Sequence, residues 1–296
     1  MSECKLLLLN VGKLGQFVLI RQAQLAAPYL SAILTQNFGP LKGHIMKKII
    51  FAALLTGAAS TATAAPLIDL YGGVYTWNAK PGGSIASHGE GKVDFKDDLN
   101  FGSDNTMVMY LGLEHFVPLV PNVRLRHMGM KDSANGTLSQ TVTIDDKQFT
   151  GSTSVHSKYD IDMTDLTLYY TPWKTLVKID AGLTVRQLDA KFSVKGDVQG
   201  RQETANLSAK ETIPLLHLGV SGKLPFTGFY AGAEVNHISY SSNRFGDYHA
   251  KIGWRSKYLL GVEAGYSQVS LKLDDVSDID SSLDWKGPYV ALSLSF

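Results

Sequence analysis

Hydrophobic and polar residues alternate with a period of two along most of the chain after residue 65. The clearest stretches are 107–114, 177–186, 216–223, 229–236 and 258–265. One face of each stretch carries aliphatic residues, and the other carries glycines and charged residues. This period predicts β-strands. Segments of about ten residues also have the length of a tilted strand that crosses a membrane.

Short turns and long polar segments alternate between these strands. The turns are predicted at 118–122, 172–174, 225–227 and 255–256, and the loops at 78–105, 133–157, 195–208, 241–247 and 274–286. Outer-membrane barrels have short periplasmic turns and long outer loops. The pattern therefore predicts an all-β, closed antiparallel barrel of about ten strands with both chain ends at the periplasmic side. Eight strands are the alternative, if the hairpin at 241–255 stays outside the membrane.

The composition of the two faces indicates that the apolar one meets lipid. In a soluble sandwich the apolar face would be the core. The polar face here is rich in glycine, which suits the crowded interior of a narrow barrel. Aromatic residues at the strand ends predict two interfacial girdles, formed by Trp173, Phe226, Phe229, Trp254, Tyr258 and Phe296 at one edge and by Trp77, Tyr240, Tyr248, Tyr266 and Trp285 at the other. His127 falls on the lipid face, which calls for a register shift or bulge in its strand.

A targeting segment lies inside the sequence. Met46 is followed by two lysines, a short apolar run and an A-x-A pattern ending at Ala64, as in a secretory signal peptide. We interpret residues 46–64 as the signal peptide, 65–296 as the barrel domain, and 1–45 as an extension that results from a wrongly assigned gene start. A real hydrophobic extension is the alternative.

The final strand carries an apolar stripe that ends in an aromatic residue, formed by Val290, Leu292, Leu294 and Phe296. This stripe resembles the signal that outer-membrane assembly machinery recognises. In its opening IDLYGG at 68–73, its strand motif EAGY at 263–266 and the entry KGPY at 286–289 to its final strand, the chain resembles a family of small Gram-negative outer-membrane β-barrel proteins of undetermined function. The resemblance implies the fold and the location in the outer membrane, and it supplies no catalytic residues.

Charge and cysteine content narrow the classes of function. The net charge is +1, so bulk electrostatics do not favour a nucleic-acid partner. The one cysteine, Cys4, precedes the predicted signal peptide. The mature chain would then have no disulfide, thiolate metal site or cysteine nucleophile.

The predicted inward face carries thirteen charged residues: Asp69, Glu114, Asp165, Asp180, Glu234 and Glu263, with Arg124, Arg126, Lys178, Arg186, Lys223, Lys251 and Arg255. Unpaired buried charges are costly, so these residues should pair and plug the lumen. The alternative is a narrow pore for small solutes, although ten strands leave little open bore.

Candidate catalytic residues are sparse. Asp247 and His249 share a face near the expected outer rim, and Asp97 and Asp98 lie in the first loop. An oriented histidine opposite a carboxylate pair activates water in omptin-type proteases. We keep an omptin-like or lipid-modifying rim hydrolase as a third hypothesis. No histidine spacing indicates a metal site. We expect a protein that is not an enzyme and has no cofactor or metal.

The expected role is structural or interactive at the cell surface. The expected partners are outer-membrane lipid and lipopolysaccharide, with periplasmic chaperones and the barrel-assembly machinery during biogenesis. The protein is expected to be a monomer, with no nucleic-acid partner.

Overall fold

The computed structural model describes residues 68–87, 91–145, 147–256, 259–276 and 279–295. The predicted extension at 1–45, the signal peptide at 46–64 and the terminal Phe296 lie outside these residues. The strands are β1 (Ile68–Ser87), β2 (Val93–Asp94), β3 (Asp104–His115), β4 (Asn122–Thr137), β5 (Val142–Ile144), β6 (Lys147–Phe149), β7 (Ser154–Lys174), β8 (Val177–Val198), β9 (Arg201–Lys223), β10 (Phe229–Tyr240), β11 (Asn243–Arg255), β12 (Leu260–Val276) and β13 (Ile279–Ser295). Among the described residues, no helix is long and apolar enough to cross a membrane.

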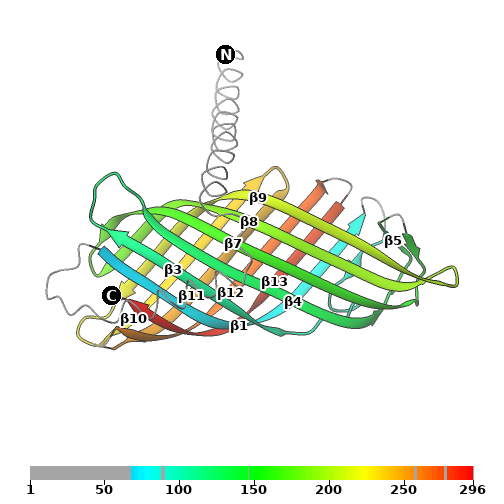
Figure 1. Ribbon diagram of the computed structural model, residues 1–296, viewed down its shortest axis with the longest axis horizontal. Helices are drawn as coiled ribbons and strands as arrows, with labels where there is room; N and C mark the ends of the chain where they lie inside the picture. The colour runs from blue at the N-terminus through cyan, green and yellow to red at the C-terminus, as the bar shows by residue number, and fades with distance from the viewer. Residues whose placement is uncertain (1–67, 88–90, 146, 257–258, 277–278, 296) are drawn as a thin grey trace, which may run out of the picture. The chain divides into compact units, whose positions relative to one another are not determined.

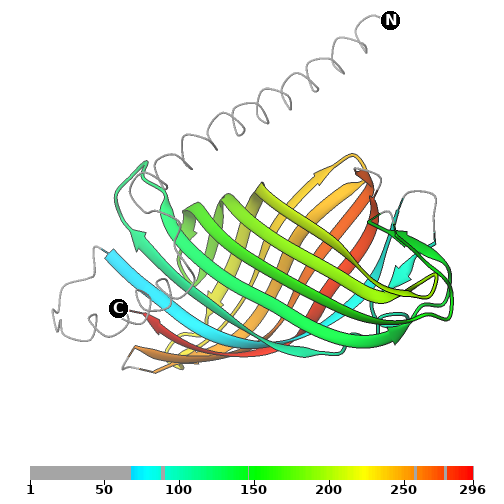
Figure 2. The ribbon, with the colours of Figure 1, turned by 45° about the vertical axis from the view of Figure 1, so that its right-hand side comes forward.

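Ten of these strands form a closed antiparallel barrel (Figures 1 and 2). Each long strand pairs with its neighbour in the sequence, and β13 pairs with β1 to close the cylinder. The prediction of a ten-stranded barrel is confirmed, and the eight-strand alternative is wrong because β10 and β11 are paired along their whole length. The short β2 pairs with the end of β1, and β5 and β6 form a separate hairpin.

The strand register fixes the geometry of the cylinder. Following the paired residues once round the barrel from Tyr71 leads back to Gly83, which is twelve residues further along β1. For ten strands this displacement corresponds to a tilt of about 40°. Each pairing step therefore rises by about one residue toward one end of the barrel. We call this the loop end, and we call the opposite end, where Ile68 and Ser295 lie, the turn end.

Most of the predicted outer loops are strands. Only Gln199 and Gly200 separate β8 from β9, and only Ser241 and Ser242 separate β10 from β11. The loops predicted at 195–208 and 241–247 are therefore wrong. β1 also continues to Ser87, inside the predicted loop 78–105. These segments look like loops because their outward residues are polar, and this hides the alternation with apolar residues on the inner face.

The apolar residues change from the outer face to the inner face of the strands partway along the barrel. On β12 the outward residues are apolar from Leu260 to Tyr266 and polar from Gln268 onward. On β8 the inward residues change from Lys178 and Asp180 near the turn end to Phe192 and Val194 near the loop end. The turn-end half thus has a polar lumen and an apolar exterior, whereas the loop-end half has the apolar interior of a soluble domain.

Part of the predicted aromatic girdle is therefore wrong. Trp77 and Trp285, predicted at the outer edge, point inward and are 0% and 3% exposed. The indole of Trp77 donates a hydrogen bond to the carbonyl oxygen of Gly287 at 3.1 Å. Tyr248 and Tyr266 do face outward. Trp77 and Trp285 therefore belong to the apolar interior above the lipid boundary, where the sense of the alternation is reversed.

His127 lies on the outer face without any register shift. The pairing of β4 with β3 and β7 is continuous through this residue, so the expected bulge is absent from these pairings. His127 Nδ1 and Thr164 Oγ1 of the paired strand lie 3.0 Å apart in a hydrogen bond. Allowing for the rise of each pairing step, His127 is about level with Tyr248 and Tyr266. The histidine therefore lies at the lipid boundary and not in the middle of the apolar band.

Glycines on the inner face make room for tyrosine rings on neighbouring strands. A Cβ atom on Gly112 would collide with the ring of Tyr71, and one on Gly253 would collide with the ring of Tyr230. Gly265 stands in the same relation to Tyr289. Each large ring is thus accommodated by a residue without a side chain. This is how a lumen of ten strands is filled without strain.

We predict that Gly112→Ala destabilises the barrel by about 1–3 kcal/mol, because the new methyl group must displace the Tyr71 ring in a packed interior. Gly102→Ala is the matched control, since nothing lies within 4 Å of a Cβ at that position. The free energy of unfolding in detergent micelles, measured by denaturant titration, compares the two. Equal stability of the two variants would contradict the packing described here.

Candidate functional site

The centre of the lumen holds a cluster of two arginines and two aspartates from four strands. Asp165 on β7 binds both guanidinium groups, with Arg126 Nη2 at 2.6 Å and Arg186 Nε at 2.7 Å. Asp247 on β11 binds the same two arginines, with Arg126 Nη2 at 2.9 Å and Arg186 Nη2 in short contact. We call these four residues the central quartet. Its charges cancel, and its side chains are almost completely buried.

Neutral polar side chains surround the central quartet. Asn236 donates from Nδ2 to Asp247 at 3.0 Å, and its Oδ1 accepts a hydrogen bond from Thr184 at 2.8 Å. His217 Nδ1 lies 2.9 Å from the same amide oxygen. The Phe245 ring lies 5.1 Å from the guanidinium carbon of Arg186. A layer of hydrogen bonds therefore links the adjacent strands β8, β9, β10 and β11 on the inner wall.

A second chain of charges lies nearer the turn end. Arg124 contacts Glu234 at 2.6 Å, and Lys251 lies 3.6 Å from both Glu234 and Glu263. Tyr230 donates a hydrogen bond to Glu263 at 2.6 Å. Every carboxylate in this group thus faces a cation, and the chain crosses the lumen from Arg124 on β4 to Glu234 on β10 before it continues to β12.

Glu114 gathers a third group. Lys174 binds it at 2.8 Å, Lys178 binds it in short contact, and the hydroxyl of Tyr169 donates to it at 3.0 Å. Lys178 also lies 3.1 Å from Asp180. This group lies beside the opening of the barrel at the turn end, where the side chain of Lys174 is half exposed.

The remaining predicted lumen residues line that opening. Ser295 donates a hydrogen bond to Asp69 at 3.1 Å, and Arg255 Nη1 lies 3.4 Å from the same hydroxyl. Lys223 makes no ion pair among the described residues. On the other face of β13, Val290 and Leu292 of the predicted assembly signal point outward and are exposed, and Leu294 is half-buried.

Asp247 is a member of this network that the sequence pattern did not predict. Asp247 adds a seventh acid to the six predicted, and Lys174, which binds Glu114, adds an eighth base to the seven predicted. The polar outward residues of 241–247 predict a loop, and this separates Asp247 from the alternating pattern of its strand. On β11 every second residue faces inward, so counting back from Lys251 through His249 identifies Asp247. The same counting on β9 and β10 identifies His217 and Asn236 as inward residues.

The geometry of Asp247 and His249 differs from that of a hydrolase. Both residues are buried in the lumen and not placed at an outer rim. The carboxylate of Asp247 is held by the two arginines, and His249 Nε2 lies 2.6 Å from the hydroxyl of Tyr289. The other ring nitrogen of His249 has no partner among the described residues. Asp98 is held in the first loop, and Asp97 is exposed on that loop, so the four candidate residues do not converge.

The loop end is closed by an apolar lid. Segment 93–101 folds back over the barrel mouth and buries Phe95, Leu99 and Phe101. The two phenyl rings contact aromatic residues of the wall, with Phe95 stacked 5.5 Å from Phe192 and Phe101 edge-on 5.0 Å from Tyr159. Together with the β5–β6 hairpin, the lid forms one continuous apolar cluster with the inner wall.

Asp98 fastens the lid to the second loop. Its carboxylate accepts hydrogen bonds from the backbone N–H groups of Asp94 at 2.8 Å and Ser139 at 2.9 Å. Burial disfavours the charged form, but the donors of Asp94 and Ser139 outweigh it, and the pKa of Asp98 lies below its usual value. Gly136 of β4 permits the close approach, since a Cβ there would run into the backbone of Asp98 and Leu99.

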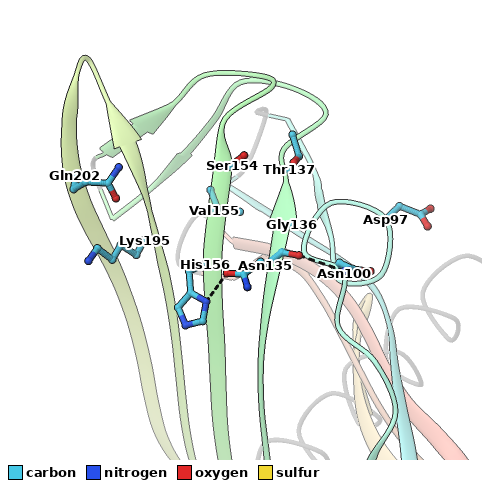
Figure 3. Close-up of a pocket in the computed structure, with 10 residues that line it drawn as sticks. All are labelled: Asp97, Asn100, Asn135, Gly136, Thr137, Ser154, Val155, His156, Lys195 and Gln202. Atoms are coloured by element: carbon cyan, nitrogen blue, oxygen red, sulfur yellow. Dashed lines mark hydrogen bonds between the residues drawn. The ribbon is translucent and has the colours of Figure 1, made fainter.

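A polar pocket lies on the outer side of the loop end (Figure 3). Its volume is about 830 Å³, and it is lined by Asp97, Asn100, Asn135, Gly136, Thr137, Ser154, Val155, His156, Lys195 and Gln202. His156 Nδ1 lies 2.8 Å from the amide oxygen of Asn135, and Asn100 Nδ2 donates to the carbonyl of Asn135 at 3.3 Å. Figure 3 shows the side chains of His156, Lys195 and Gln202 on adjacent strands beside one another. Amides, hydroxyls and one amine thus present hydrogen-bonding groups to a ligand.

Metal-ligand geometry is not found in the described part of the chain. No group of three or more His, Cys, Asp and Glu side chains is arranged there to hold a metal ion.

No protein-family model and no curated protein sequence matches the chain. Among solved structures, it is similar to the outer-membrane protease OmpT of Escherichia coli, with 10% identity, a TM-score of 0.47, and coverage of 81% of this chain and 100% of that one. It is also similar to the translocator domain of the autotransporter NalP of Neisseria meningitidis, with 11% identity, a TM-score of 0.40, and coverage of 86% and 96%.

The closed barrel itself fixes the location. In a cylinder without free sheet edges, the backbone hydrogen bonds of every strand are satisfied within the lipid. Such a cylinder with an exposed apolar band and a charged interior is the architecture of outer-membrane proteins. The protein is a β-barrel of the bacterial outer membrane whose lumen contains buried, paired charges.

We predict that Arg186→Met destabilises the barrel by about 3–5 kcal/mol, because it leaves two buried carboxylates to share one arginine. Lys131→Met is the matched control. Its ion pair with Asp160 lies on the outer surface and is largely exposed, so its loss costs at most about 1 kcal/mol. Denaturant unfolding in micelles measures both values. If the two variants are equally stable, the quartet does not hold the barrel together.

Proposed function

We propose that this protein is a sealed barrel that acts through the surface it displays at its loop end, without conducting solutes and without catalysis. The observation that carries the proposal is that two independent layers cross the interior. The central quartet crosses it with charges, and the apolar lid covers the mouth above. A solute would have to break the first layer and displace the second.

The charged layer is a poor conduction path. All four oxygens of Asp165 and Asp247 are bound by arginines. An ion that entered would have to replace these partners at a considerable desolvation cost. Aqueous channels are usual at sixteen or more strands, whereas narrower barrels are filled by side chains. The narrow pore therefore remains the second hypothesis.

The arrangement of the histidines argues against a hydrolase. A general base needs an orienting partner and access to substrate. His249 is bound to Tyr289 inside the lumen, and Asp247 is neutralised by arginines. These observations support a protein that is not an enzyme.

The polar pocket supports a surface-binding role. Among the described residues, the side chains of Lys195 and Gln202 have no hydrogen-bond or ion-pair partner, and both line the pocket. An amine beside amides and hydroxyls suits a ligand rich in hydroxyl groups, such as a saccharide. The other expected partners are the lipid and lipopolysaccharide around the barrel and the assembly machinery that inserts it. The barrel is expected to act as a monomer.

We predict that the purified protein gives no open-channel current in a planar lipid bilayer. Because two layers seal the lumen, removal of residues 94–101 alone and the change Arg126→Ser/Arg186→Ser alone should each leave it closed, whereas the combination should conduct. Heat-modifiable migration on a gel verifies that each variant is folded. A robust current through the unchanged protein would defeat the sealed-barrel proposal and favour the pore.

We predict that the protein in lipid nanodiscs binds saccharides on a glycan array, and that Lys195→Ala/Gln202→Ala weakens this binding at least tenfold. Lys158→Ala is the control, because this exposed lysine of β7 lies outside the pocket. Binding that the double variant leaves unchanged would remove the pocket from the proposal. Absence of any bound saccharide would remove this class of ligand.

A further inference from the structure

All four turns at the turn end expose large apolar side chains. Leu119 in the β3–β4 turn is 91% exposed, and Phe226 in the β9–β10 turn is fully exposed. Leu176 and Leu259 are exposed in the other two turns. Residues 116–121 and 224–228 contain no charged residue. By contrast, the hairpins at the loop end turn at Gln-Gly and Ser-Ser, as expected for segments in water.

The backbone of these turns makes the choice of residue unusual. Leu119, Phe226 and Leu259 have φ values of 65°, 64° and 71°, in the left-handed region. Glycine and asparagine are favoured there, and bulky side chains are disfavoured. A large apolar residue at such a position, pointing away from the protein, requires a compensating gain outside the turn. Burial of the side chain in an apolar medium supplies such a gain.

The apolar band of the barrel wall is too short for the membrane. On β11 the outward aromatic residues Tyr248 and Trp254 mark its two edges six residues apart, and on β8 the outward apolar stripe runs over eight residues from Val177 to Val185. At the tilt of this barrel, six to eight residues span about 15–20 Å along the axis. The apolar band of outer-membrane barrels is about 25 Å tall. The strands alone therefore leave a deficit of several ångströms at one end.

The deficit can be made up only at the turn end. Beyond Tyr248 and Tyr266 the outward residues are polar, as at Gln268 and Lys272. At the opposite edge the outward stripe of Val290 and Leu292 runs directly toward the apolar turns. The exposed turn residues are thus continuous with the lipid-facing surface.

We propose that the β3–β4 and β9–β10 turns are inserted into the lipid, with Leu119 and Phe226 anchored among the acyl chains of the nearer leaflet. The membrane-spanning surface then comprises the short apolar wall together with these turns. The partner is the lipid itself, and no protein is needed to cover this end.

Site-directed spin labelling tests the proposal in vesicles of phosphatidylethanolamine and phosphatidylglycerol. Cys4→Ser removes the one native thiol, and single cysteines replace Leu119, Phe226 or, as the control, Gln199 at the opposite tip. We expect labels at 119 and 226 to be at least tenfold more accessible to oxygen relative to a water-soluble nickel chelate than the label at 199. Heat-modifiable migration verifies that each labelled protein is folded.

Two outcomes would overturn the proposal. If labels at 119 and 226 collide with the nickel chelate as readily as the label at 199, the turns are in water. If they are shielded from both reagents, a protein surface covers them, and cross-linking then distinguishes a second copy of this chain from another partner.

Discussion

A charged group inside a narrow barrel has almost no water to solvate it, so it must find its counter-charge on another strand. This constraint organises the lumen. The central quartet draws its members from β4, β7, β8 and β11, and the link from Arg126 and Arg186 to Asp247 spans strands that are not neighbours in the sheet. Hydrogen bonds between backbones close the cylinder, and these side-chain bonds hold opposite walls at a fixed distance.

The quartet also marks the level at which the barrel changes character. Below it, lysines, arginines and tyrosines fill the lumen while aliphatic residues face outward. Above it, the wall turns its apolar residues inward, and the lid with Phe95 and Phe101 completes a core like that of a soluble protein. One continuous set of strands is thus suited to lipid in its lower half and to water in its upper half. Reversing the alternation of polar and apolar residues requires no change in the backbone.

The sequence was sufficient to predict the strand count and most of the lumen, because the period of two is visible wherever one face is aliphatic. It was insufficient for the loop-end strands, where polar outward residues concealed the alternation. Trp77 and Trp285 were placed on the wrong side for the same reason, since the period of the pattern does not tell which face is inside. The alternation of β11 places Asp247 inside, but its pairing with Arg126 and Arg186 depends on register across the barrel. No local pattern encodes that register.

The most direct test of this account is a cysteine scan of the outward residues of β12 in vesicles, with a membrane-impermeant maleimide as the probe. The account predicts that cysteines at Val262 and Ala264 are protected, and that labelling begins between Tyr266 and Gln268 and continues through Ser270 and Lys272. Equal labelling at all of these positions would show that the apolar stripe does not face lipid, and it would contradict the account at its foundation.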